Sequence, residues 1–333
     1  MAAVAAAAGV SQQTVSRVLH NSPAVSAATS QKVRDTIAAL AYRPNLAARA
    51  LATGSTRVIG ALVSSTTLSG PSGALLGIEQ TARADGYWIS MAGLRSNTAA
   101  EVTEVISHFI NQGVDGVIAV AQTQMAVDAT LTAVGTMPTV LVTSGRVPDG
   151  HFTLDIDQAG AARQVMGLLR QLGHSAIAHV SGPTGDLHAE ARVEGWRSSL
   201  PAKAEAIVYE GDWSSASGYR AGQALLARRP RPSAIFAAND HMAFGVLRAL
   251  NEAGLRVPRD LSVVGFDNIQ GSDCSIPPLT TVDQTHTELG QAAMALILEA
   301  MAGQPARRVT IPGRLIVRES TGAPPEANPA VRP

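Results

Sequence analysis

This chain of 333 residues has only one cysteine, no long apolar run and no formal net charge. The one cysteine, Cys274, excludes a disulfide within the chain and fits a reducing cytoplasm. No stretch approaches the roughly 18 consecutive apolar residues that a membrane-spanning helix needs. The apolar start, Met1–Val10, is too short for a secretory signal and lacks its basic residues. These absences predict a soluble, cytoplasmic protein.

Motifs of enzyme chemistry are also missing. The sequence has no Gly-x-Ser-x-Gly nucleophile turn, no His-Glu-x-x-His zinc motif, no Walker loop and no Gly-x-Gly-x-x-Gly. The eight histidines are scattered along the chain, and His174 lies in a Leu-Gly-His turn of structural character. Since no spacing indicates a nucleophile or an acid–base pair, we expect neither catalysis nor a metal or organic cofactor.

The formal net charge is zero, but the charges are unevenly distributed. Up to Arg57 there are six basic residues and one acidic residue, a net charge of +5, and the remainder carries −5. A basic segment on an acidic body is typical of a phosphate-binding module joined to a sensor domain. Charge alone leaves chance clustering on the surface as the alternative.

The basic segment contains a pattern typical of a helix-turn-helix. Gly9 supplies a tight corner, and Ser11 is a suitable N-cap for a helix over Gln12–Leu19. Val15 and Val18 are three residues apart and face inward. The polar residues left outward are Gln12, Gln13, Ser16 and Arg17. Glutamine and arginine suit paired hydrogen bonds with adenine and guanine edges in the major groove, although a polar helix face is more often simply solvated.

Two further helices complete this head. Ala3–Ala8 precedes the turn, and a third helix begins at Ser26 or Ala27, with an apolar face formed by Val33, Ile37 and Leu40. Pro44 then opens a possible helix over Asn45–Leu51, before a Gly/Ser/Thr segment. We therefore assign residues 1–42 to the DNA-binding head and residues 43–57 to a hinge helix and linker.

From Val58 onward, strands alternate with helices, which predicts an α/β core of parallel sheets covered on both faces. The expected strands are Val58–Val63, Tyr87–Met91, Gly116–Val120, Thr139–Val142, Ile177–Ser181, Ala206–Tyr209, Ala234–Ala237 and Ser262–Phe266. The expected helices are Leu75–Asp85, Ala100–Gln112, Ala159–Leu172, Gly218–Ala227 and Met242–Ala253. About 260 residues are long for one sheet, so we predict two doubly wound subdomains. Their predicted extents are about 58–155 with 285–313, and about 156–284 with 314–320, followed by a disordered tail, 321–333.

Polar residues that follow predicted strands mark a possible ligand cleft, because ligands of open α/β sheets bind beyond the carboxyl ends of the strands. Asp157, Asn239 and Asp267 qualify, although each alone is more often a helix cap. Trp213, in a loop, can stack on a sugar ring or belong to the core. Arg192, on a helix, can be a solvated charge or a fork for two hydroxyls.

These motifs resemble the LacI–GalR family of bacterial repressors, from about Val4 to about Arg318. The motifs that carry the resemblance are Val10–Leu19, Arg43-Pro44-Asn45 with Leu51, Leu172-Gly173-His174, Gly182-Pro183, Glu210-Gly211-Asp212-Trp213-Ser214, Ala238-Asn239-Asp240, Ser262–Asp267 and Cys274–Thr281. The resemblance implies a helix-turn-helix head, a hinge helix and a periplasmic-binding-protein-like core. It also implies a dimeric repressor of operator DNA that is controlled by a small sugar.

The resemblance assigns roles to individual positions. The expected DNA-contacting residues are Ser11, Gln12, Gln13, Thr14, Ser16, Arg17, Asn45, Arg49 and Leu51, of which Leu51 would wedge into the minor groove. The expected effector-contacting residues are Pro71, Ser72, Asp157, His188, Arg192, Trp213, Asn239, Asp267, Gln284 and His286. A galactoside inducer is the specific expectation. The alternatives are a sugar-binding protein of transport or sensing, and a repressor that answers to another effector.

Three departures from the family pattern matter. The chain begins where the family's first helix is already under way, so that helix lacks its usual capping threonine. His286 and His188 stand where one similar member of the family has phenylalanine and serine, which changes the expected selectivity among sugars. No leucine heptad follows residue 320, so the expected assembly is a dimer rather than a tetramer.

Overall fold

The computed structural model describes residues 1–19, 22–42, 53–64, 69–202 and 204–325. These divide into two compact units, Met1–Thr56 and Arg57–Pro333, here called the head and the core. Within these ranges, we find no helix with the length and apolar character needed to cross a bilayer.

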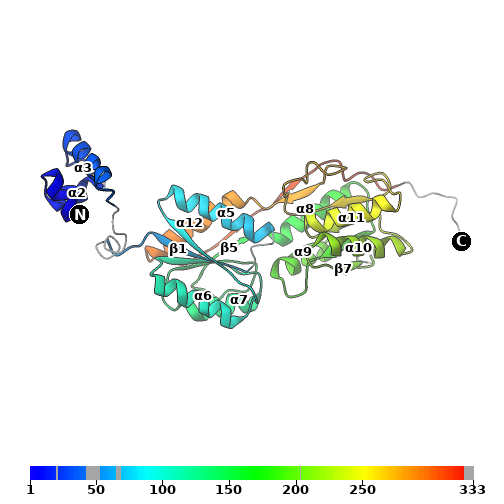
Figure 1. Ribbon diagram of the computed structural model, residues 1–333. Helices are drawn as coiled ribbons and strands as arrows, with labels where there is room; N and C mark the ends of the chain where they lie inside the picture. Colours follow the sequence, from blue (N-terminus) through cyan, green and yellow to red (C-terminus); the bar gives the residue numbers. More distant parts are fainter. Residues whose placement is uncertain (20–21, 43–52, 65–68, 203, 326–333) are drawn as a thin grey trace. The chain divides into compact units, whose positions relative to one another are not determined.

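The head is a bundle of short helices around a small apolar centre (Figure 1). Its helices are α1 (Ala2–Ala8), α2 (Gln12–Leu19) and α3 (Ala27–Ala39). Gly9 turns the chain between α1 and α2 with a φ of +64°, a conformation that favours glycine. Val15 and Val18 of α2 are buried against α1 and α3, as predicted. Leu40 does not continue the apolar face of α3, because it lies at the end of the helix and is 48% exposed.

The first lobe of the core is a six-stranded parallel sheet in the order β11-β5-β4-β3-β1-β2. Its strands are β1 (Val58–Val63), β2 (Trp88–Gly93), β3 (Gly116–Val120), β4 (Thr139–Val142), β5 (Phe152–Ile156) and β11 (Arg308–Ile311). Helices α5 (Ser69–Ala84) and α12 (His286–Met301) cover one face, and α6 (Ala99–Gln112) and α7 (Gln124–Val134) cover the other (Figure 1). An apolar cluster on each face explains why the strands read as continuous apolar runs.

The second lobe is a four-stranded parallel sheet in the order β7-β6-β8-β9. Its strands are β6 (Ile177–Ser181), β7 (Val208–Glu210), β8 (Ala234–Ala237) and β9 (Ser262–Val264). Its helices are α8 (Gln158–Gln171), α9 (Leu187–Ser198), α10 (Ser215–Ala227) and α11 (Asp240–Glu252). Two apolar clusters lie on opposite faces of this sheet, one under α10 and α11 and one under α8 and α9.

The chain passes between the lobes after β5, before α12 and after β11. The strands β10 (Thr281–Asp283) and β12 (Arg314–Ile316) form an antiparallel pair beside the second lobe. Thr321 and Gly322, which the sequence assigned to the tail, are ordered: the Gly322 amide donates to Ser262 Oγ at 3.0 Å. Residues 326–333 of the predicted tail lie outside the described residues.

Most predicted strands occur as expected, and the differences have local causes. β9 ends at Val264 rather than Phe266, because the Gly265 amide donates to the Thr280 carbonyl instead of continuing the ladder. The prediction lacked β5, the strands from β10 to β12, and the helices α7 and α12. β5 carries Asp155 and Thr153 within its apolar residues, so it does not read as a continuous apolar run.

A histidine lies inside the second lobe. His179, in β6, is fully buried between the rings of Trp196 and Phe236, whose centroids are 5.5 and 4.6 Å from its own. His179 Nδ1 donates to the Phe236 carbonyl at 2.9 Å, and Nε2 has no hydrogen-bond partner among the described residues. Burial lowers the pKa of His179 to about 3, so the ring is neutral.

We expect the replacement His179→Phe to reduce the acid sensitivity of the fold. Between pH 6.5 and about 3 the unfolded chain binds a proton at His179 that the folded chain does not bind, so stability falls as the pH falls through this window. The expected loss is at most about 1.4 kcal/mol per pH unit for this group. Thermal melts from pH 7 to 4 measure it, and His108→Phe, at an exposed position, is the control. Equal slopes of melting temperature against pH in wild type and His179→Phe contradict the prediction.

Candidate effector cleft and DNA-reading helix

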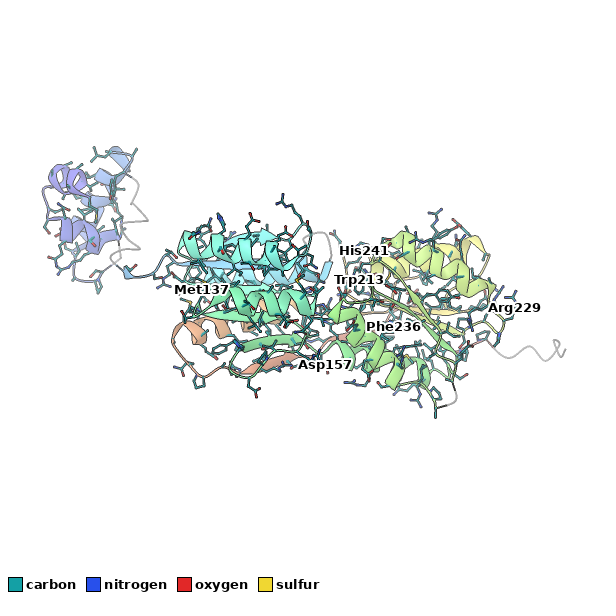
Figure 2. The ribbon with its side chains drawn as sticks, turned by 90° about the horizontal axis from the view of Figure 1, so that it is seen from below. Met137, Asp157, Trp213, Arg229, Phe236 and His241 are labelled. Atoms are coloured by element: carbon teal, nitrogen blue, oxygen red, sulfur yellow. The ribbon has the colours of Figure 1, made fainter. Side chains whose placement is uncertain are left out.

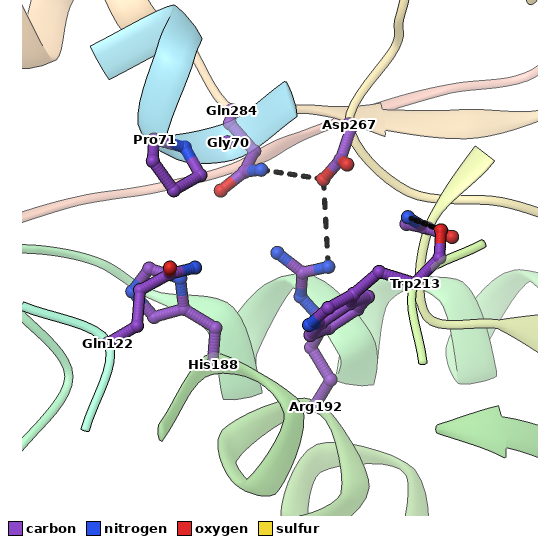
Figure 3. A pocket seen from close by; sticks show the side chains of 9 residues that line it. Gly70, Pro71, Gln122, His188, Arg192, Trp213, Asp267 and Gln284 are labelled. Atoms are coloured by element: carbon purple, nitrogen blue, oxygen red, sulfur yellow. Dashed lines mark hydrogen bonds and ion pairs between the residues drawn. The ribbon is translucent and has the colours of Figure 1, made fainter. Parts of the chain in front are cut away.

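The carboxyl ends of the strands in the two lobes face each other (Figures 1 and 2), and the cavities between them form the cleft. Figure 2 shows Asp157 and Trp213 near this junction. One cavity there is lined by residues of both lobes: Gly70, Pro71, Gln122, His188, Arg192, Trp213, Asn239, Asp267 and Gln284 (Figure 3). We call this the first cavity.

Helix α9 places two of these side chains on one face. Asp186 caps the helix by accepting hydrogen bonds from the amides of His188 and Ala189 at 2.9 and 3.0 Å. His188 and Arg192 are four residues apart, one helical turn, so both point into the cleft.

Arg192 is the central cation of the cleft and is 3% exposed. Its Nη1 donates to the Ala238 carbonyl and lies 3.6 Å from Asp267 Oδ1. Its guanidinium carbon lies 3.8 Å from the centroid of Phe266 and 5.5 Å from that of Trp213. Contacts with two aromatic rings and an ion pair with a carboxylate fix the orientation of the guanidinium.

Two glutamines connect Arg192 to Asp267 through a chain of hydrogen bonds across the lobe junction. The ion pair between Arg192 and Asp267 closes this chain into a ring. Arg192 Nε donates to Gln158 Oε1 at 2.9 Å, and Gln158 Nε2 donates to Gln284 Oε1 at 3.0 Å. Gln284 Nε2 donates to Asp267 Oδ1 at 2.7 Å, a bond that Figure 3 marks. Because Gln158 and Gln284 lie where the chain passes between the lobes, this ring joins the cleft to the crossing segments.

Trp213 is held by its neighbours with little freedom. Gly182 makes room for it, because a Cβ at that position would lie 2.3 Å from the indole. Asn239 caps α11 by accepting from the Met242 amide at 2.8 Å, and its Nδ2 donates to the Trp213 carbonyl at 3.0 Å. Trp213 and Asp267 have φ values of +69° and +107°, which non-glycine residues rarely adopt and which cost about 1–3 kcal/mol each. Such strain commonly accompanies a ligand site.

Burial sets the charges in the cleft. It raises the pKa of Asp267 to about 7, against the effect of Arg192, which lowers it. Burial also lowers the pKa of Arg192 from its ordinary value, while the charge of Asp267 raises it. His188 is buried enough for its pKa to fall to about 3, so this ring is neutral. The cleft thus offers an arginine donor, a carboxyl group, amides and an indole face, the groups that suit hydroxyl pairs and the C–H face of a sugar.

A second cavity adjoins the first and shares Gly70, Pro71, His188 and Gln284 with it. Its remaining residues are Ala74, Val120, Val142, Asp155, Ile156, Gln158, His286 and Leu289. His286 fits against α5 because Gly73 has no side chain; a Cβ there would lie 2.3 Å from His286 Nδ1. Burial lowers the pKa of His286.

The predicted effector residues are not all in these cavities. Most of the set line the first cavity: Pro71, His188, Arg192, Trp213, Asn239, Asp267 and Gln284; His286 lines the second. Asp157 lines neither cavity. Its Oδ1 caps α8 by accepting from the Gly160 amide at 2.7 Å and lies 3.9 Å from Arg163 Nη2. Ser72, partly buried in α5, also lines neither.

Three polar lining residues were not among the predicted ones. Gln122 comes two residues after β3, so the rule of polar residues following strands could have found it. Asp155 and Gln158 lie in and just after β5, which was not predicted. Among the described residues, no group of three histidine, cysteine, aspartate or glutamate side chains could hold a metal ion.

The head presents a second candidate site on α2. Gln12, Gln13 and Arg17 are exposed, whereas Ser16 is partly buried. Ser11 Oγ accepts from the Thr14 amide at 3.0 Å and lies 2.9 Å from Thr14 Oγ1, so it caps the helix as predicted. The predicted contacts Asn45, Arg49 and Leu51, with the hinge helix, lie outside the described residues.

Comparisons with known proteins agree with this arrangement. The family model "Bacterial regulatory proteins, lacI family" matches residues 1–45, and "Periplasmic binding protein-like domain" matches residues 166–321. The lactose operon repressor of Escherichia coli (strain K12) is 35% identical over 328 residues, 96% of this chain and 90% of that protein. Catabolite control protein A of Priestia megaterium is 33% identical over 326 residues, 96% and 98% of the two chains.

Solved structures give the same result. A lac repressor dimer bound to operator and the anti-inducer ONPF has a TM-score of 0.87 at 34% identity and covers 96% of this chain and 98% of its own. A complex of the transcriptional regulator CelR with cellobiose has a TM-score of 0.72 at 31% identity, covering 95% and 98%.

Fold and site together define a bacterial transcriptional regulator with a DNA-binding head and a periplasmic-binding-protein-like core. The chain belongs to the LacI family of bacterial regulatory proteins. The predictions of family and fold class are therefore confirmed. The relatives are transcriptional regulators, which also agrees with the prediction that the protein is not an enzyme.

Proposed function

We propose that this protein is a dimeric transcriptional repressor whose affinity for operator DNA is controlled by a small sugar. The observation that carries the proposal is the cleft between the lobes, where Arg192 and Asp267 face one another beside Trp213. The exposed Gln12, Gln13 and Arg17 on α2 support the DNA-reading role. The solved relative bound to operator as a dimer supports both the partner and the assembly.

The expected mechanism is a linkage between two sites. In the dimer, two heads read two half-sites about 34 Å apart or at a related spacing. A sugar that favours one arrangement of the lobes shifts the segments leading to the heads, and operator affinity falls. Sugar and operator must then weaken each other's binding by equal factors.

A galactoside inducer is our specific candidate, on the strength of the similarity to the lactose operon repressor. The second candidate is a glucoside, which the CelR complex with cellobiose favours. A sugar-binding protein of transport is disfavoured, because a transport protein has no use for the helix-turn-helix head.

A thermal-shift screen tests the proposal. Galactosides, glucosides and free sugars are added to the full chain, and a sugar present at 100 times its Kd should add about 2.7 kcal/mol to the stability of the core. Operator DNA selected from a random duplex library is then titrated in gel shifts with and without that sugar. We expect the sugar that raises the melting temperature to weaken operator binding. If no sugar stabilises the protein, the effector belongs to another chemical class.

A further inference from the structure

The second cavity contains a carboxylate that was not among the predicted effector-contacting residues. Asp155 is the penultimate residue of β5 and lies at the carboxyl edge of the first-lobe sheet, where it lines the cavity together with His188 and His286. The cleft therefore has an acidic group at each end, Asp267 in the second lobe and Asp155 in the first.

The surroundings of Asp155 leave its acceptor capacity unfilled. Its Oδ1 accepts from Ser144 Oγ at 2.7 Å, and the Ile156 amide supplies a further donor. A carboxylate has about four acceptor positions, and these two donors leave part of them unfilled. Because Asp155 lines the cavity, the unfilled positions are available to a ligand there. The other walls there are largely apolar: Ala74, Val120, Val142, Ile156 and Leu289.

The neighbouring imidazoles do not neutralise this carboxylate. Burial lowers the pKa of both His188 and His286, so both rings are uncharged near pH 7. Burial raises the pKa of Asp155 to about 6, while the Ser144 hydrogen bond and the charge of Arg308 lower it. At pH 7 the group is therefore mostly ionised, in a cavity where a ligand must supply the missing donors.

The two cavities adjoin, which places an effector bound in the first beside the second. They share His188 and Gln284, and Gln284 also donates to Asp267. A sugar ring held by Arg192 and Asp267 would extend whatever it carries toward Asp155.

We propose that Asp155 is a specificity-determining residue that accepts hydrogen bonds from hydroxyl groups on the far part of the effector. The preferred effectors then carry a hydroxylated group at that end, such as a second sugar ring, and an apolar aglycone is rejected. This inference rests on the proposed sugar-controlled function. An apolar group at this end would leave the remaining acceptor positions of an ionised carboxylate unfilled, which hydrophobic contact with the other walls does not offset.

Two matched pairs of probes test the proposal by calorimetry at pH 7. Lactose is compared with phenyl β-D-galactoside, and cellobiose with phenyl β-D-glucoside; each pair shares one ring and differs in a hydroxylated or an aromatic partner. Wild type should bind the disaccharide of its preferred pair at least tenfold more tightly than the phenyl glycoside. Asp155→Leu should lose at least tenfold for the disaccharide and gain for the phenyl glycoside.

Two further variants separate selectivity from folding. Asp155→Asn keeps the size of the side chain and an acceptor for Ser144, and should reduce the preference without reversing it. Asp149→Leu makes the same change at an exposed position before β5 and should leave the preference unaltered.

Each remaining outcome overturns a different statement. A wild-type preference for the phenyl glycoside, or an unchanged preference in both Asp155 variants, overturns the inference and leaves the sugar-controlled function in place. Failure of wild type to bind any of the four probes, or any sugar in the thermal screen, overturns the inference together with the proposed function.

Discussion

Arg192→Ala should weaken sugar binding more than tenfold and give a repressor that binds operator but does not respond to sugar. The change removes a fixed cation from the cleft, and each charge-assisted hydrogen bond lost to a ligand hydroxyl costs about 1.5–3 kcal/mol. It also leaves Asp267 buried without its ion pair, so we expect the core to lose stability by up to about 3–5 kcal/mol. Calorimetry, thermal melts and gel shifts with sugar measure the three effects.

Arg197→Ala is the matched control, since Arg197 is exposed on the same helix. Arg192→Lys keeps the charge but loses the planar fork, and should recover stability more than affinity. Sugar affinity in Arg192→Ala equal to that of wild type, with a folded core, would show that the ligand lies elsewhere.

Arg17→Ala should weaken operator binding by roughly 1–3 kcal/mol, about 5- to 150-fold, and relax the base preference at one operator position. Arg17 is exposed on α2, whereas the valines on either side of it in the sequence, Val15 and Val18, are buried in the head. A guanidinium there can make two hydrogen bonds with a guanine, which the alanine variant cannot replace. Binding to a set of operators with single base changes measures both effects.

The control for Arg17 is Arg34→Ala, which removes the same charge from an exposed position on α3. It should lower affinity for all sequences by similar factors and leave the base preference intact. The same uniform loss in Arg17→Ala would mean that Arg17 contacts only phosphate.

The sequence predicts the fold well where local pattern and tertiary environment agree. Val58–Val63 and Gly116–Val120 are continuous apolar runs, and both become buried strands with the predicted bounds. β11 begins with Arg308, and only Ile311 of its four residues is buried, so no apolar run marks it. It becomes a strand because β5 pairs with it, a contact between residues more than 150 positions apart that local periodicity cannot register.

The site is predictable to a similar extent. Arg192, Trp213 and Asp267 could be proposed from residue type and resemblance, and all three line the first cavity. The ring through Gln158 and Gln284 depends on how the lobes meet at their crossing segments, which no local pattern specifies. Asp157, which the resemblance places among the effector contacts, caps α8 and lines neither cavity, so its ligand contact stays a prediction.

The pairing of β5 with β11 also constrains how the protein is made. The first-lobe sheet gains its edge strand β11, and one helix of its cover, α12, only after the four-stranded sheet of the second lobe has been synthesised. Domains tend to fold as units during synthesis. Here the first lobe emerges before the second but stays incomplete until α12 and β11 have also emerged. Until about residue 311 leaves the ribosome, the face of the sheet that α12 covers is open and β5 is an unpaired edge, a state prone to aggregation. The second lobe emerges in nearly one piece, so we expect it to gain protease resistance before the lobe that precedes it.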